Sequence, residues 1–149
     1  MTPVKRSLPK PPGTRGADTP TAFSETFGAL RGMLAKVGHS LEVTADTPTD
    51  FQLASKTMID RRGKPLFVAA VQIKKNYVSY HLMPIYAVPG LVDTLSPALR
   101  KRMQGKACFN FTTVGAAELK ELEAVTRSGF SQFKKIRLPW VHDPQRWRQ

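Results

Sequence analysis

Alternating apolar and polar residues predict an antiparallel sheet in the middle of this chain. Residues 66–73 (LFVAAVQI), 77–83 (YVSYHLM) and 107–113 (ACFNFTT) alternate with a period of two, as strands with one buried face do. Two extended pieces in residues 40–55 surround a Thr/Asp/Pro turn, and Arg62-Gly63 marks a tight turn before the next strand. Because these segments follow one another closely, we expect a meander of antiparallel strands.

Segments with helical periodicity come before and after the predicted strands. An apolar stripe over residues 19–38 predicts a first helix, and it consists of Phe23, Phe27, Leu30, Leu34 and Val37. Residues 115–130 (GAAELKELEAVTRSGF) predict a last helix, with Ala117 inward and Glu121 outward, and Ser96-Pro97 opens a short one that should end at Gly105. The predicted fold class is α+β: a compact two-layer sandwich in which an antiparallel sheet of about four to six strands packs against helices.

Two glycines interrupt the surface of the predicted first helix. Gly28 and Gly32 are four residues apart, so they leave one flank of the helix without side chains. We expect this flank to approach the sheet closely.

The alternation also assigns strand residues to two faces of the sheet. The apolar face, which should meet the helices, contains Phe67, Ala69, Val71, Ile73, Val78, Tyr80, Leu82, Ala107, Phe109 and Phe111. Val68 and Ala70 are expected on the opposite face. Its polar members are Gln72, Ser79, His81, Cys108, Asn110 and Thr112.

Four residues of the second face, Ser79, His81, Cys108 and Asn110, are candidates for binding a ligand. His81 and Cys108 are soft metal ligands, and they are also a base and a nucleophile in many enzymes. We favour the simpler interpretation that His81 is a polar residue on a half-exposed face with a small cysteine beside it. The chain has no CxxC, HExxH, GxGxxG or phosphate-loop motif, so we predict that it is not an enzyme.

Carboxylates suggest a second, weaker metal site. Glu42, Asp46 and Asp50 could bind a hard cation together with His81, although their spacing spans a turn and does not follow an EF-hand pattern. The competing interpretation, which we favour, is ordinary turn chemistry.

Basic residues are concentrated at the two ends of the chain. The 149 residues contain 23 Lys and Arg against 11 Asp and Glu, which gives a net charge of +12. Residues 1–20 are basic and rich in proline, which predicts a disordered arm, and residues 134–149 predict a basic tail after a domain at 21–133. Cations with tryptophan suit nucleic-acid binding, and the tail offers Lys134, Lys135, Arg137, Trp140, Arg146, Trp147 and Arg148. Equally, one tryptophan could fold back onto the domain.

The composition of the chain also indicates the compartment in which the protein is expected. No apolar run approaches the roughly 18 residues that a membrane span requires, and the first residues lack the apolar stretch of a secretory signal. A single cysteine, Cys108, allows no internal disulfide and fits a reducing compartment. We therefore expect a cytoplasmic protein without a membrane partner.

Three stretches resemble a known family. KKNYVSYHLMPIY (74–86), LSPALRKRMQGKACFNF (95–111) and the late ELKEL (118–122) are similar to the YdhG-like domain of unknown function, which is found in small bacterial proteins. The resemblance covers roughly residues 21–133. It implies a compact sandwich comparable to frataxin, and a role as an iron chaperone in which carboxylates of the first helix and the following strand bind iron.

Three functions remain open at this point. The chain could be a non-enzymatic carrier of a metal such as iron, with no other cofactor expected. It could instead bind an anionic partner such as nucleic acid through its basic arms. A third alternative is a protein–protein adaptor that uses Tyr77, Tyr80 and Tyr86.

Overall fold

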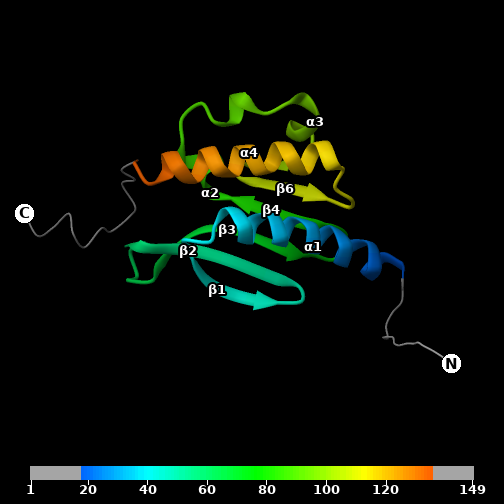
Figure 1. The fold of residues 1–149 in the computed structure, drawn as a ribbon, viewed down its shortest axis with the longest axis horizontal. Coiled ribbons are helices and arrows are strands. Elements are labelled where there is room, and N and C mark those ends of the chain that lie inside the picture. The colour runs from blue at the N-terminus through cyan, green and yellow to red at the C-terminus, as the bar shows by residue number, and fades with distance from the viewer. Residues whose placement is uncertain (1–17, 136–149) are drawn as a thin grey trace, which may run out of the picture.

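An antiparallel sheet with helices against one side makes up residues 18–135, the part of the chain that the computed structural model describes (Figure 1). The six strands are β1 (Glu42–Thr47), β2 (Asp50–Ile59), β3 (Pro65–Ile73), β4 (Val78–Leu82), β5 (Met103–Gln104) and β6 (Cys108–Phe111). Their order across the sheet is β1-β2-β3-β4-β6-β5, and every neighbouring pair is antiparallel. The predicted α+β fold class is confirmed.

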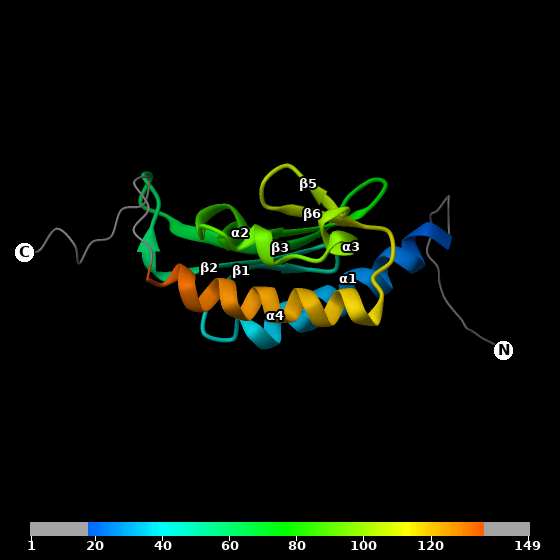
Figure 2. The ribbon, with the colours of Figure 1, turned by 90° about the horizontal axis from the view of Figure 1, so that it is seen from above.

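Two long helices cover one face of this sheet. Helices α1 (Asp18–Val37) and α4 (Ala116–Phe133) lie beside each other and run in the same direction (Figures 1 and 2). The short elements are α2 (Met83–Ala87), the 3-10 helix η1 (Val92–Thr94) and α3 (Pro97–Arg100). Ser96 caps α3 by accepting a hydrogen bond from the Leu99 N–H, and Glu121 of α4 accepts hydrogen bonds from the backbone N–H and hydroxyl of Ser96. Glu121, expected to point outward, thus joins α3 to α4.

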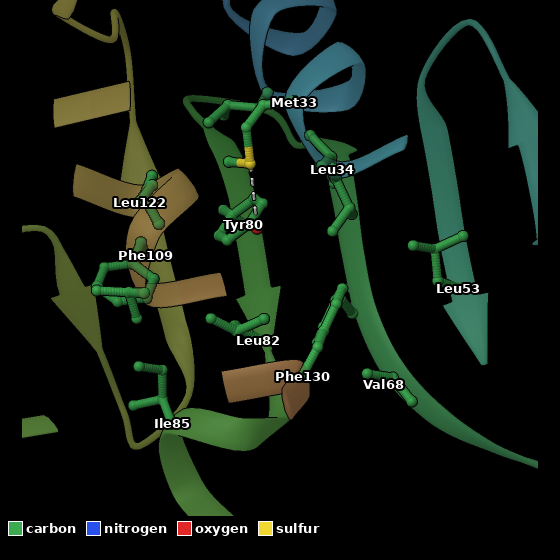
Figure 3. Close-up of a cluster of buried hydrophobic side chains, with 14 of the residues drawn as sticks. Met33, Leu34, Leu53, Val68, Tyr80, Leu82, Ile85, Phe109, Leu122 and Phe130 are labelled. Atoms are coloured by element: carbon green, nitrogen blue, oxygen red, sulfur yellow. Dashed lines mark hydrogen bonds between the residues drawn. The ribbon is translucent and has the colours of Figure 1, made fainter. Parts of the chain in front are cut away.

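The hydrophobic core fills the space between the helices and the sheet (Figure 3). Leu30 and Leu34 of α1, Tyr80 of β4 and Leu122 of α4 are completely buried. The Tyr80 hydroxyl lies 2.7 Å from the Thr126 hydroxyl, so this buried polar group is hydrogen-bonded. The predicted apolar stripe of α1 is confirmed at Phe23, Phe27, Leu30 and Leu34, which are all buried.

A β-bulge changes which side chains of β3 face the core. Leu53 of β2 pairs with Ala69, whereas the next residue, Ala54, pairs with Phe67, so Val68 is the extra residue. Val68 and Ala69 therefore both lie on the core side, and Val68 is 1% exposed. The assignment of Val68 to the polar face and of Phe67 to the apolar face was wrong, because simple alternation does not survive a bulge.

The expected close approach at Gly28 and Gly32 was also wrong. Both glycines are exposed, and a Cβ atom added at either would meet no atom within 4 Å. The chain approaches the sheet closely at Gly38, directly after α1, where an added Cβ would overlap the side chain of Leu53 in β2. A second close approach occurs at Gly129 of α4, where an added Cβ would lie 2.9 Å from the Cβ of Pro84. Ala117, expected to point inward, is exposed.

The two long helices lie close to their predicted positions. Helix α1 begins at Asp18, next to the predicted start at Thr19, and α4 ends at Phe133. Residues 1–17 and 136–149 lie outside the described residues, so the basic arm and tail stay predictions. Between residues 18 and 135, no helix is long and apolar enough to cross a membrane.

Candidate functional site

The face of the sheet opposite α1 and α4, here called the open face, carries polar side chains in two rows that cross the strands. Strand pairing places Asp50, Gln72, Ser79 and Asn110 in one row. The adjacent row contains Gln52, Ala70, His81, Cys108 and Gln104. The four predicted ligand-face candidates, Ser79, His81, Cys108 and Asn110, are thus neighbours on β4 and β6.

His81 packs against Phe67 on this face. The two rings meet edge-on, with their centroids 5.0 Å apart. This contact exists because the bulge at Val68 turns Phe67 away from the core and toward the open face. Burial lowers the pKa of His81 below its ordinary value of 6.5, so the imidazole is neutral at pH 7.

Cys108 lies directly across from His81 on the neighbouring strand. Opposed residues on adjacent strands have Cβ atoms about 4.5–5.5 Å apart, within the span of two ligands of one metal ion. The Cys108 thiol lies 3.4 Å from the Ser79 hydroxyl, within hydrogen-bonding distance for sulfur. Cys108 and Asn110 are half-buried, while Ser79 is 5% exposed. Thr112, also expected here, follows the end of β6, and its carbonyl accepts a hydrogen bond from the Thr26 hydroxyl.

Asp50 is held at the end of the first row by two glutamine side chains. The amide of Gln52 donates to both carboxylate oxygens, at 3.1 and 3.0 Å, and the amide of Gln72 donates to Oδ1 at 3.0 Å. Gln52 is a member of this face that was not predicted. Its alternation with Phe51 and Leu53 would have placed it there.

The three predicted carboxylates do not come together. Asp46 pairs with Phe51 across β1 and β2 and lies on the helix side, where it accepts two 2.8 Å hydrogen bonds from Arg31 of α1. Glu42 is exposed and pairs with Ala54, in the row beyond the one that contains His81. In the described part of the chain, no three His, Cys, Asp or Glu residues are grouped so that they could hold a metal ion by themselves.

The other candidate groups fall elsewhere. Lys134 and Lys135 are exposed just after α4, and the remaining predicted nucleic-acid contacts, Arg137, Trp140, Arg146, Trp147 and Arg148, lie outside the described residues. The tyrosine cluster is divided. Tyr80 is completely buried, whereas Tyr86 is 48% exposed in α2, with Lys106 over its ring. Tyr80 therefore cannot belong to an adaptor surface.

Comparison of the chain with family models, with curated proteins and with solved structures found no match.

Proposed function

We propose that this chain is a non-enzymatic binding protein of the YdhG-like type that carries a metal ion, iron in the first instance, on the open face of its sheet. The observation that carries the proposal is the cross-strand pairing of His81 with Cys108. The layered fold, with helices on one side of an antiparallel sheet, supports the affiliation because it is the architecture that the resemblance implies.

The protonation state of His81 favours binding. Metal ions bind the neutral imidazole, and a proton competes with them for the same nitrogen. Because burial lowers the pKa of His81, little free energy is lost to deprotonation at pH 7. If the side chain of His81 or of Cys108 rotates toward the other, the imidazole nitrogen and the thiolate sulfur can bind the same metal ion.

Only two strong ligands are provided, and this suits a carrier. Water molecules or groups of a recipient protein would fill the other positions around the ion, so the ion could leave readily. The Asn110 side chain, the Ser79 hydroxyl and the Gln104 side chain, which lies across from Cys108, offer further oxygens in the two rows. Asp46 and Asp50 are less suited as metal ligands, because their carboxylate oxygens already accept hydrogen bonds. Arg31 donates to Asp46, and the two glutamines donate to Asp50.

The arrangement of Ser79, His81 and Cys108 supports catalysis less than it supports metal binding. In the structure the Cys108 thiol is next to the Ser79 hydroxyl, whereas the ring of His81 packs on Phe67, so the thiol is not hydrogen-bonded to the base that would activate it. The proposal therefore assigns the face to binding.

An anaerobic Fe²⁺ titration of isotope-labelled full-length protein, followed by amide signals at moderate salt, tests the proposal. We expect selective broadening around His81, Cys108 and Ser79. The His81→Ala/Cys108→Ser double variant should weaken binding by roughly tenfold or more.

A matched triple variant, with Glu42→Gln, Asp46→Asn and Asp50→Asn, serves as the control. It removes the alternative carboxylate ligands and should leave the broadening pattern unchanged. Broadening around those carboxylates, or none at millimolar Fe²⁺, would overturn the proposal.

A further inference from the structure

Six exposed cations gather at one end of the molecule. Four belong to the end of β2 and the turn into β3, and two follow α4; they are Lys56, Arg61, Arg62, Lys64, Lys134 and Lys135. Packing explains why they meet. Phe130 in the last part of α4 lies near Leu53 and Val68, so the end of α4 covers the sheet close to this hairpin (Figure 3). Figures 1 and 2 both place the β2–β3 turn and the end of α4 at the same end of the fold.

Carboxylates balance little of this charge. Asp60 is the single acidic residue in 55–65, and residues 130–135 have none. Asp60 shapes the turn by accepting hydrogen bonds from the N–H groups of Arg62 and Lys64, at 2.8 and 3.1 Å. Asp60 also forms an ion pair with the Arg62 side chain, at 3.6 Å. The two segments at this end therefore carry six cations against one carboxylate.

The hairpin extends beyond the rest of the sheet as a two-stranded ribbon with one irregular stretch, because the register of β2 against β3 shifts between Ala54 and Ile59. The pairing of β1 with β2 ends at Ala54, and the pairing of β4 with β3 begins at Ala69. Residues 55–68 therefore have no further strand on either side among the residues that the structure describes. The turn at its tip is tight, with Gly63 at a φ of 82°. A two-stranded ribbon of this kind fits the major groove of B-form DNA, which is about 12 Å wide.

We propose that this basic ribbon, with the end of α4, binds the phosphate backbone of duplex DNA. The proposal is independent of the metal site, because the six cations lie outside the rows that contain His81 and Cys108. Phe67, at the base of the ribbon, contacts the His81 ring but is not part of the proposed DNA contact. A membrane surface fits less well. The large apolar side chains that are exposed in the described part, Val43 and Tyr86, lie in β1 and α2 rather than at the ribbon, so the ribbon lacks the apolar groups that strengthen attachment to a membrane surface.

The test is fluorescence anisotropy of a labelled DNA duplex with the full-length protein over a range of salt concentrations. The Lys56→Gln/Arg61→Gln/Lys64→Gln variant should bind on the order of tenfold more weakly at low salt. The slope of log K against log salt should become shallower by about 3, since each phosphate contact contributes about 0.9.

The matched control also removes two lysines and one arginine, but at positions away from the ribbon. Lys74 and Lys75 follow the other end of β3 and Arg100 ends α3, and all three are exposed. The Lys74→Gln/Lys75→Gln/Arg100→Gln variant should bind DNA nearly as wild type. Equal losses in both variants would show an effect of net charge alone and overturn the proposal. So would absent DNA binding combined with binding to vesicles of phosphatidylcholine and phosphatidylserine.

Discussion

His81 occupies a position that is neither core nor free surface. Its ring touches Phe67 on one neighbouring strand, while Cys108 opposes it on the other. Burial disfavours the charged imidazolium, so the pKa of His81 is lowered. With a lowered pKa, the neutral imidazole of His81 is more available as a metal ligand than that of an exposed histidine.

A ring-proton NMR titration of His81 should show a midpoint below 6.5. The unfolded chain then binds the proton more readily than the folded chain, so the free energy of unfolding falls as the pH falls from 6.5 through the folded-state pKa. Replacing Phe67 with Ala admits water to the ring and should move the midpoint up toward 6.5. A midpoint at or above 6.5 in the wild type, or no change on Phe67→Ala, would contradict this account.

The residues of the open face show what alternation can and cannot predict. It placed Ser79, His81, Cys108 and Asn110 together because β4 and β6 are regular and directly paired. It failed at Phe67 because the bulge at Val68 depends on how β3 pairs with β2, and no local pattern in the sequence specifies that pairing. The ring that desolvates His81 was therefore not predictable.

At the scale of elements, the glycines of the two long helices have opposite roles. Gly28 and Gly32 of α1 face open space, whereas Gly129 of α4 lets α2 approach. An added Cβ at Gly129 would also lie 3.3 Å from Leu91, so little room exists for the helices to adjust.

Gly32→Ala should raise the free energy of unfolding by about 0.5–1 kcal/mol, because alanine loses less backbone entropy in a helix. Gly129→Ala should lower it, since overpacking costs on the order of 1–3 kcal/mol and outweighs the propensity gain. Urea denaturation of both variants measures the difference. If Gly129→Ala stabilises the protein as much as Gly32→Ala, the contact between α4 and α2 is not as tight as described.

The long elements were predictable and the short ones were not. Helices α1 and α4 and the central strands have enough residues to show their periods. Ser96-Pro97 correctly marks the start of α3, but the predicted end at Gly105 was wrong, because α3 ends at Arg100 and residues 103–104 form β5. Helix α2, at residues 83–87, and strand β5, at residues 103–104, are too short to show a period. Their conformations depend on tertiary contacts such as the packing of Pro84 beside Gly129.

At the scale of the molecule, the candidate metal ligands and the cluster of cations lie in different parts of the fold. The open face combines His81 and Cys108 with uncharged polar side chains and one carboxylate, Asp50, that is already hydrogen-bonded. A cluster of six cations lies at the basic ribbon and the end of α4, beyond the paired rows. A metal ion on the open face and an anionic polymer at the ribbon could therefore bind at the same time.

The most direct test of metal binding on the open face is the absorption spectrum with Co²⁺, a spectroscopic substitute for Fe²⁺. If Cys108 is a ligand, an intense near-ultraviolet charge-transfer band from thiolate to Co²⁺ should appear on titration. The band should be lost in Cys108→Ser and weakened in His81→Ala, but kept in the triple carboxylate variant. No band in the wild type, or an unchanged band in Cys108→Ser, would contradict the account.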